Sequence, residues 1–165
     1  MPDLVLYELA QRAGQALEQR GWMLATAESC TGGWVSEAIT MVPGSSAWFD
    51  RGFVTYTYVS KREMLGVRSE TLEAEGAVSE TCVREMVQGA LKASRAQAAL
   101  AVSGTAGPGG GTPQKPVGTV CFAWGFQGRE ARAETLLFAG DREEIRRKAV
   151  IHTLSVLIQE LEVPA

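Results

Sequence analysis

The sequence predicts a three-layer α/β/α domain built on a mixed β-sheet. Segments with helical spacing of apolar residues alternate with short apolar segments through most of the chain. Two further β-rich segments are separated only by a short polar stretch, which is typical of an antiparallel hairpin. The length of 165 residues fits a single domain, residues 1–165, that can bury an apolar core.

The first third of the chain predicts a helix, a strand and a second helix. Residues 4–20 place apolar side chains on one helical face, and Gly21 follows as a C-terminal stop. Residues 23–27 are short and mostly apolar, as in a buried strand, and residues 34–41 look helical. The polar, glycine-containing segment 28–33 therefore forms a tight turn between a strand and a helix.

The middle of the chain predicts one strand followed by three short helical segments. Residues 48–58 are rich in aromatic and β-branched side chains and predict a strand. Ser60 or a neighbour is expected to cap a short helix that carries Lys61. Residues 69–72 begin another helical piece, and Ser79 is expected to cap a clearer amphipathic helix.

The last third predicts a buried strand, a loop, a hairpin and a long helix. The compact apolar run 98–102 leads into the glycine-rich segment 103–111. Residues 117–126 and 131–138 form the predicted hairpin, and a helix starts near Asp141. Strand order cannot be derived from these patterns.

Composition excludes several classes of protein. Sixteen Lys and Arg against 19 Asp and Glu give a net charge of −3, which predicts no nucleic-acid partner. No basic segment leads into an apolar one at the N-terminus, and no apolar run reaches the roughly 18 residues of a membrane span. Three cysteines with one histidine do not make a standard zinc site, so we expect a cytoplasmic protein with reduced thiols and no metal.

Ser29 is the first candidate for a catalytic nucleophile. Its position between a strand and a helix predicts free backbone N–H groups at Cys30, Thr31 and Gly32, which can stabilise an oxyanion. Gly32 and Gly33 let a ligand approach the backbone closely. The alternative is that Ser29 or Thr31 only caps the helix, because serine and threonine are common cap residues.

Two side chains could serve as the base for Ser29. His152 is the only histidine, and it is predicted on the solvated face of the last helix, which disfavours a Ser-His-Asp triad. Lys61, with Tyr56 nearby, can act instead if burial lowers the pKa of its amine. Cys30 is the rival nucleophile, because thiol pKa values fall at helix N-termini.

The glycine-rich segment 104–111 could present backbone N–H groups to a phosphate. It matches neither a Walker A loop nor the dinucleotide-binding G-x-G-x-x-G pattern. A plain flexible loop is therefore equally compatible with the sequence. Its position after a predicted buried strand favours a ligand site, since ligands of α/β proteins gather beyond strand carboxyl ends.

Four sequence segments, taken in order, are far more specific together than any one alone. They are residues 26–33 (TAESCTGG), Gly44-Ser45-Ser46 with Phe49, Gly52, Val54, Tyr56 and Lys61, residues 76–79 (GAVS), and Ser103-Gly104 to Gly107-Pro108 leading into residues 115–120 (KPVGTV). Together they resemble the CinA C-terminal domain family, the nicotinamide-nucleotide amidases, over about residues 5 to 160.

The resemblance implies hydrolysis of nicotinamide mononucleotide to nicotinate mononucleotide and ammonia, a step of NAD salvage. It implies no cofactor or metal, a homo-oligomer, and a catalytic Ser29–Lys61 pair with Tyr56 beside it. The segments that it places at the nucleotide are Gly44, Ser45 and Ser46, then Ser103, Gly104, Thr105, Ala106 and Gly107, and a basic motif with Arg142 and Arg146.

One departure from the family pattern concerns Tyr58, which stands where the family usually has asparagine. If that asparagine orients substrate or lysine, Tyr58 alters turnover or specificity. Two rival functions stay open. One is a nucleotide-binding module without chemistry, which the Tyr58 departure favours, and the other is an amidase that uses Cys30 as nucleophile. A role in DNA uptake, suggested by the CinA name, conflicts with the acidic net charge.

Overall fold

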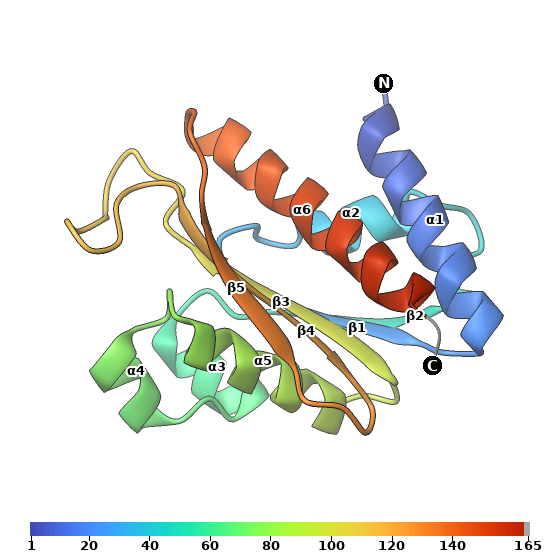
Figure 1. Cartoon of the computed structure of the whole chain (residues 1–165), viewed down its shortest axis with the longest axis horizontal. Helices are drawn as coiled ribbons and strands as arrows, with labels where there is room; N and C mark the ends of the chain where they lie inside the picture. The colour runs from blue at the N-terminus through green and yellow to red at the C-terminus, as the bar shows by residue number, and fades with distance from the viewer. Residues whose placement is uncertain (164–165) are drawn as a thin grey trace.

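The computed structural model describes residues 1–163, in which one β-sheet carries helices on both faces (Figure 1). The strands are β1 (Leu24–Glu28), β2 (Phe49–Val54), β3 (Ala98–Gly104), β4 (Thr119–Phe126) and β5 (Arg132–Leu137). The helices are α1 (Leu4–Arg20), α2 (Trp34–Thr40), the 3-10 helix η1 (Ser45–Ala47), α3 (Tyr58–Leu65), α4 (Ser69–Glu75), α5 (Glu80–Lys92) and α6 (Arg142–Glu162).

The sheet is mixed, with strand order β2-β1-β3-β4-β5. β1 pairs in parallel with β2 and with β3, whereas β3 and β4, and β4 and β5, pair antiparallel. The predicted hairpin between β4 and β5 is therefore confirmed. Because β1, β2 and β3 run in the same direction, their carboxyl ends meet at one edge of the sheet, and the segments that follow them lie close together there.

The three-layer α/β/α prediction is also confirmed. One face of the sheet is covered by α1, α2 and α6, the other by α3, α4 and α5 (Figure 1). Large side chains such as Leu100 and Trp124 point to the first face, and small ones such as Ala25 and Ala101 to the second. The small side chains let α5 lie close to the sheet.

α3 packs closely on α5 because of a glycine. A Cβ built on Gly89 of α5 would lie 1.9 Å from the Leu65 carbonyl oxygen, so only glycine fits at this contact. The contact brings α3, with Lys61 in its first turns, into the second layer of helices. This contact between two helices thus determines where Lys61 enters the core.

The junction of β2 and α3 differs from the sequence prediction. The strand predicted over residues 48–58 ends at Val54, and Tyr58 is already helical. Thr57, rather than Ser60, caps α3: its hydroxyl accepts from the Ser60 N–H at 3.1 Å, and the Ser60 hydroxyl accepts from the Thr57 N–H at 3.0 Å. This reciprocal capping outweighs the β-propensity of the tyrosines.

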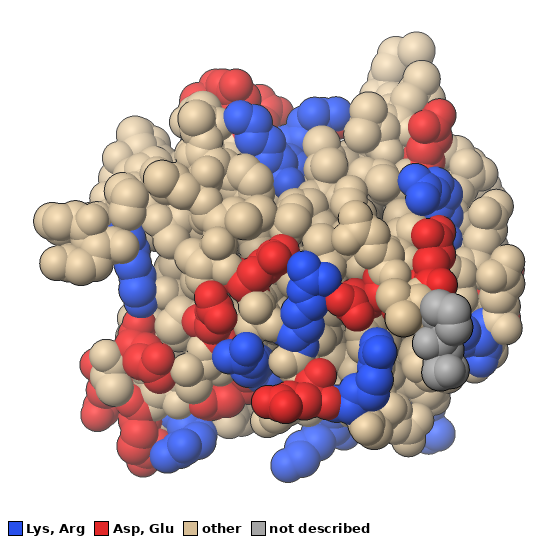
Figure 2. All heavy atoms as spheres, viewed as in Figure 1, with Lys and Arg blue, Asp and Glu red and all other residues tan. Residues whose placement is uncertain are grey.

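The other predicted helix boundaries agree with the structure. Gly21 ends α1 in the left-handed conformation, and Ser79 and Asp141 cap α5 and α6. Among residues 1–163, no helix has the length and apolar character needed to cross a membrane. Figure 2 shows acidic and basic side chains interspersed on the face that it displays, without a broad patch of one sign.

Candidate active site

Ser29 lies at the carboxyl end of β1, where the three parallel strands end together. Its backbone N–H donates to the Val102 carbonyl of β3 at 2.9 Å, which extends the β1–β3 ladder by one residue. The chain turns immediately afterwards, and α2 begins at Trp34. The predicted strand–turn–helix setting of Ser29 is therefore confirmed.

Lys61 reaches Ser29 from the opposite side of the cleft. Its Nζ lies 2.8 Å from Ser29 Oγ and donates to the Thr55 carbonyl at 2.6 Å. Only 1% of the Lys61 side chain is exposed. Burial lowers the pKa of Lys61 below its usual 10.5, since desolvation disfavours the ammonium form. The two groups that a serine–lysine pair needs are thus within hydrogen-bond distance.

Two backbone N–H groups next to Ser29 have no acceptor among the described residues, and the second of them belongs to a fully buried residue. Within residues 1–163, no acceptor bonds the N–H of Cys30 or the N–H of Thr31. The prediction that the Gly32 N–H is also free is wrong, because it donates to the Ser29 carbonyl at 3.0 Å and closes the turn. The Cys30 N–H is therefore the donor beside Ser29 that a ligand can reach, because Thr31 is fully buried.

Glu28 holds the turn from inside the protein. One carboxylate oxygen accepts from the Thr31 hydroxyl at 2.6 Å and from the Val35 N–H at 2.9 Å. The other accepts from the Ser36 N–H at 2.9 Å and from the Ser36 hydroxyl at 2.7 Å. The fully buried carboxylate therefore joins the end of β1 to the start of α2.

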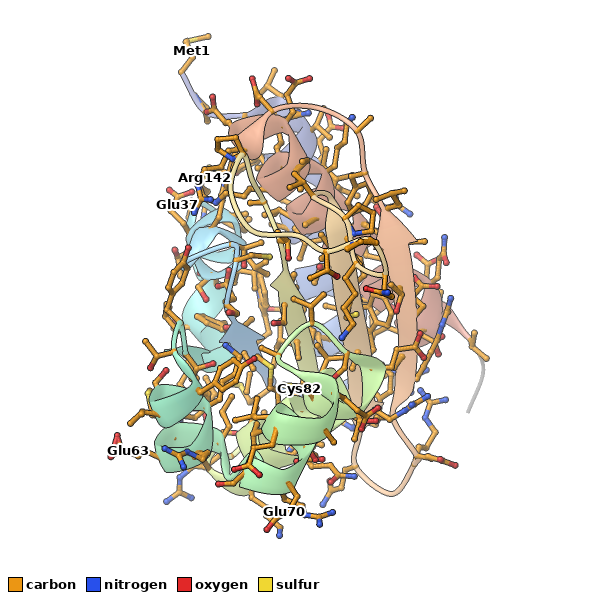
Figure 3. The ribbon with its side chains drawn as sticks, turned by 90° about the vertical axis from the view of Figure 1, so that its left-hand side faces the viewer. Met1, Glu37, Glu63, Glu70, Cys82 and Arg142 are labelled. Atoms are coloured by element: carbon orange, nitrogen blue, oxygen red, sulfur yellow. The ribbon has the colours of Figure 1, made fainter. Side chains whose placement is uncertain are left out.

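A cavity of about 250 Å³ opens in front of Ser29 and Lys61. Figure 3 views the chain from this edge of the sheet, with Arg142 at the start of α6 and Cys82 on α5 of the opposite layer. The side chains and backbone that line the cavity are Ser29, Cys30, Tyr56, Tyr58, Lys61, Ala77, Val78, Ser103, Gly104, Thr105, Ala106, Gly107, Gly109 and Arg142.

Tyr56 and Arg142 form one wall of this cavity. Arg142 donates to the Tyr56 hydroxyl at 2.9 Å and to the Gly107 carbonyl at 2.8 Å, and so ties the glycine-rich loop to the β2–α3 junction. Among the described residues, Tyr56 makes no hydrogen bond to Ser29 or Lys61. Tyr58, the departure from the family pattern, lines the same cavity and is half exposed.

Other predicted site residues do not line the cavity. Thr31 turns its hydroxyl to Glu28, and Gly32 and Gly33 take left-handed conformations that shape the turn. The turn at residues 44–46 lies at the other end of the sheet, because it precedes β2, and Trp48 just after it bonds Leu24 at the start of β1. The structure thus separates Gly44, Ser45 and Ser46 from Ser29, since β1 and β2 are parallel.

Two expectations about reactive side chains are corrected. Burial raises the pKa of the Cys30 thiol to about 12, so desolvation outweighs the effect of the helix start. His152 is not a solvated surface residue: its ring packs edge-on against Phe122 and it bonds Glu134 of β5. It does not line the cavity. Cys82 and Cys121 are buried.

Several residues of the site were not predicted from sequence. Ala77 and Val78 line the cavity, and Thr55 holds Lys61. Arg146 of α6, which the resemblance places with Arg142 at the nucleotide, instead bonds the turn after Ser29 and does not line the cavity. Glu28 could have been found, because a carboxylate inside a buried apolar strand requires several hydrogen-bond donors. Among residues 1–163, no group of three or more Asp, Glu, His or Cys side chains could hold a metal ion.

The fold and the site define an α/β protein with a buried serine–lysine pair at the carboxyl edge of its parallel strands. The model of the CinA C-terminal domain matches residues 6–161, and the chain belongs to this family.

Relatives with curated names are similar over nearly the whole chain. Nicotinamide-nucleotide amidohydrolase PncC of Escherichia coli K12 is 52% identical over 160 residues, which covers 97% of each chain. The PncC protein of Pseudomonas putida is 52% identical over 151 residues, covering 92% of this chain and 94% of its own. The crystal structure of the competence/damage inducible protein CihA from Agrobacterium tumefaciens superposes with a TM-score of 0.93 at 45% identity, covering 99% and 98% of the two chains.

Proposed function

We propose that this chain hydrolyses the carboxamide of nicotinamide mononucleotide to nicotinate mononucleotide and ammonia, with Ser29 as nucleophile and Lys61 as general base. The observation that carries the proposal is the 2.8 Å approach of Lys61 Nζ to Ser29 Oγ inside the protein. The names of the PncC relatives support the substrate and the reaction.

The first step is the attack of Ser29 on the amide carbon. Neutral Lys61 has one lone pair, and because its N–H already donates to the Thr55 carbonyl, the lone pair is free to accept the Ser29 proton. Burial favours the neutral amine by disfavouring its charged form. A substrate ring that carries a positive charge has the same effect on a nearby amine.

The tetrahedral intermediate carries a negative charge on the former amide oxygen. The N–H group of Cys30, which lines the cavity, is the donor that can stabilise this charge, and such a donor is worth roughly 10²–10³ in rate. Protonated Lys61 then gives its proton to the leaving nitrogen, the C–N bond breaks and ammonia departs. An ester between Ser29 and the nicotinoyl carbon remains.

Water completes the reaction by the same route. Lys61 accepts a proton from the water as its oxygen attacks the ester carbon, and the proton returns to Ser29 Oγ when the C–O bond breaks. The nicotinate carboxylate is released. No step requires a redox change or a further reactant, so the atoms of substrate and water account for both products.

The remainder of the substrate occupies the cavity beside the dyad. Arg142 and the glycine-rich loop are the groups that suit the phosphate, because one supplies positive charge and the other backbone donors. Tyr56 keeps Arg142 at the cavity wall, and Tyr58 borders the same space. In this proposal Tyr56 acts on the substrate site and has no part in proton transfer.

Ammonia release from nicotinamide mononucleotide tests the proposal. The wild-type chain should release ammonia and form an ester on Ser29 that mass spectrometry detects after acid quenching. The Ser29→Ala variant should do neither. A chain that gains thermal stability from the nucleotide but releases no ammonia would instead be a nucleotide-binding module.

The proposal has three further parts. The reaction is a step in pyridine nucleotide salvage, the protein is located in the cytoplasm, and the chain forms a homo-oligomer. The reaction and the free thiols support the first two. Analytical ultracentrifugation of the purified chain tests the third.

A further inference from the structure

Ser103, near the carboxyl end of β3, is only 1% exposed, yet its hydroxyl has no hydrogen-bond partner within residues 1–163. In that part of the chain, every side-chain oxygen or nitrogen of a non-exposed residue that is sealed from solvent has a partner. The Ser103 hydroxyl is therefore not sealed, and the space that Ser103 lines is the cavity in front of Ser29 and Lys61. A buried hydroxyl without a partner in the protein is available to a ligand.

Ser103 and Ser29 lie side by side on neighbouring strands. The Ser29 N–H donates to the Val102 carbonyl of β3, so Ser29 and Ser103 are the next residues along the two paired strands. Side chains alternate along a strand, and Ala27 and Ala101 both face the layer of α3 and α5. Ser29 and Ser103 therefore face that layer too, on strands that lie about 4.8 Å apart.

Lys61 and Ser103 flank Ser29 from opposite sides. The strand order β2-β1-β3 places the end of β2 on one side of Ser29 and the end of β3 on the other. The Lys61 amine is held on the β2 side, because it donates to the carbonyl of Thr55, the residue that follows β2. A group bonded to Ser29 Oγ thus has an amine on one side and the Ser103 hydroxyl on the other.

This arrangement orients the amide that Ser29 attacks. In the proposed mechanism Lys61 protonates the leaving nitrogen, so this nitrogen lies on the Lys61 side. The amide oxygen then points to the opposite side, where Ser103 lies. That oxygen becomes negatively charged in the tetrahedral intermediate, and a serine hydroxyl is one of the donors that can stabilise such a charge.

We propose that Ser103 is a catalytic residue whose hydroxyl donates a hydrogen bond to the oxyanion, as a second donor beside the Cys30 N–H. In the turn after Ser29, the Thr31 N–H is buried and the Gly32 N–H bonds the Ser29 carbonyl, so a second donor has to come from another strand. The inference rests on the proposed amidase function for the identity of the oxyanion.

Nucleotide binding is the competing explanation, because the family resemblance places Ser103 with the glycine-rich segment at the nucleotide. The position of Ser103 favours the reacting amide. It lies beside Ser29 in the sheet and is buried, whereas Thr105, further along the same segment, is half-buried. The two roles predict different kinetics, because a nucleotide contact acts on substrate binding and an oxyanion contact acts in the transition state.

Thr135 of β5 provides a matched control in the same row of the sheet. The register pairs Ser103 with Cys121 of β4, and Cys121 with Thr135. The Thr135 hydroxyl donates to Glu80 at 2.8 Å, and Thr135 does not line the cavity in front of Ser29. Thr135→Ala therefore removes a hydroxyl from this row without altering the surroundings of the nucleophile.

The first experiment measures ammonia release from nicotinamide mononucleotide by Ser103→Ala, Ser103→Cys and Thr135→Ala. We expect Ser103→Ala to lower kcat about 100-fold with KM changed less than about threefold, because one oxyanion donor is lost. Ser103→Cys keeps the size of the side chain but is a weak donor, so its kcat should stay at least about tenfold below wild type. Thr135→Ala should keep kcat within about twofold.

Two kinetic results would overturn the inference. One is wild-type kcat in Ser103→Ala. The other is a raised KM at unchanged kcat, which would assign the Ser103 hydroxyl to the nucleotide.

Pyridine-3-boronic acid supplies a second measurement that does not depend on turnover. Ser29 Oγ adds to the trigonal boron, its proton passes to Lys61, and boron becomes a tetrahedral anion that resembles the intermediate. In a crystal structure of this adduct, one oxygen on boron should lie within about 3 Å of Ser103 Oγ. An adduct whose oxygens both point away from Ser103 would contradict the proposed contact.

The two measurements separate a failure of this inference from a failure of the proposed function. An adduct with the expected contact, in a chain that releases no ammonia, would reject the substrate and support the role of Ser103. If ammonia is released but no adduct forms, the kcat of Ser103→Ala decides. If the wild-type chain gives neither ammonia nor an adduct, Ser29 is not the nucleophile, and the role of Ser103 is rejected with it.

Discussion

Two regions flank Ser29, and each buries one ionisable side chain in a different way. On the α2 side, the carboxylate of Glu28 accepts four hydrogen bonds, two of them from backbone N–H groups. On the α3 side, the hydrogen-bond partners of the Lys61 amine within residues 1–163 are Ser29 Oγ and the Thr55 carbonyl. Both side chains are almost fully buried, so burial alone does not distinguish them.

The difference lies in what each region offers to a charge. A backbone N–H can only donate, and each oxygen of Glu28 faces one N–H and one hydroxyl, so this region offers four donors to the carboxyl group. In the described part of the chain, no carboxylate forms an ion pair with Lys61, and desolvation lowers the pKa of its amine. Glu28 therefore holds structure by accepting hydrogen bonds, whereas Lys61 suits proton transfer because burial favours its neutral form.

The largest effect is expected where the neutral amine is removed. Lys61→Arg keeps hydrogen-bond donors at this position but cannot act as a base, because a guanidinium is not deprotonated in proteins. We expect kcat/KM for nicotinamide mononucleotide to fall by about 10³-fold or more. Lys148 serves as the control, because its Nζ also donates to a backbone carbonyl, that of Ala139, at 2.5 Å. Lys148→Arg should retain wild-type activity, and an active Lys61→Arg variant would exclude Lys61 as the base.

The next largest effect is expected in the region around Glu28. In Glu28→Gln, the amide NH₂ must face a backbone N–H in either orientation, because each oxygen position has one. We expect the free energy of unfolding to fall by about 2–3 kcal/mol, and kcat to fall with it because the turn loosens. Urea titration measures the first and ammonia release the second.

An exposed glutamate of α2, the helix whose start Glu28 holds, controls for the loss of charge. Glu37 lies in the first turn of α2 (Figure 3), and Glu37→Gln should change the free energy of unfolding by less than about 0.5 kcal/mol. Equal stabilities of Glu28→Gln and Glu37→Gln would show that the buried network does not require an anion. The contrast between the two regions would then disappear.

The pH dependence of stability tests the Lys61 side of the comparison. Because burial lowers its pKa, the folded chain loses the Lys61 proton at lower pH than the unfolded chain does, which titrates near 10.5. Between those two pKa values the unfolded state binds more protons, so unfolding free energy rises with pH by at most about 1.4 kcal/mol per unit. The Lys61→Met variant lacks this contribution. Urea titrations of both proteins from pH 7 to 10 should diverge, and parallel curves would contradict a lowered pKa.

Much of the fold could be predicted because its elements carry local signals. The periodicity of α1 and α6, the glycine after α1 and the cap at Ser79 are properties of adjacent residues. The end of β2 could not be placed, because Phe53, Tyr56 and Tyr58 all favour strands. At this junction the reciprocal Thr57–Ser60 cap determines that a helix begins, and the strength of the cap depends on the helix that forms after it.

The site was less accessible to sequence analysis because it depends on distances between remote segments. The setting of Ser29 followed from local pattern, but its contact with Lys61 came from family resemblance, since spacing does not show that α3 packs on α5. The glycine turn at residues 44–46 shows the opposite case. It resembles a family segment, yet the parallel direction of β1 and β2 places it at the far end of the sheet from Ser29.

The smallest effect is expected at Cys30, the neighbour of Ser29 that lies between the two regions. Its thiol shares the helix start, but burial raises its pKa to about 12, so it stays protonated near neutral pH and is a poor nucleophile. What residue 30 contributes in our mechanism is its backbone N–H, which alanine also has. Cys30→Ala should therefore keep kcat within about threefold, whereas Ser29→Ala should abolish ammonia release. An inactive Cys30→Ala protein that remains folded, together with an active Ser29→Ala protein, would show that Cys30 is the nucleophile. Lys61 would then be the base for a thiol.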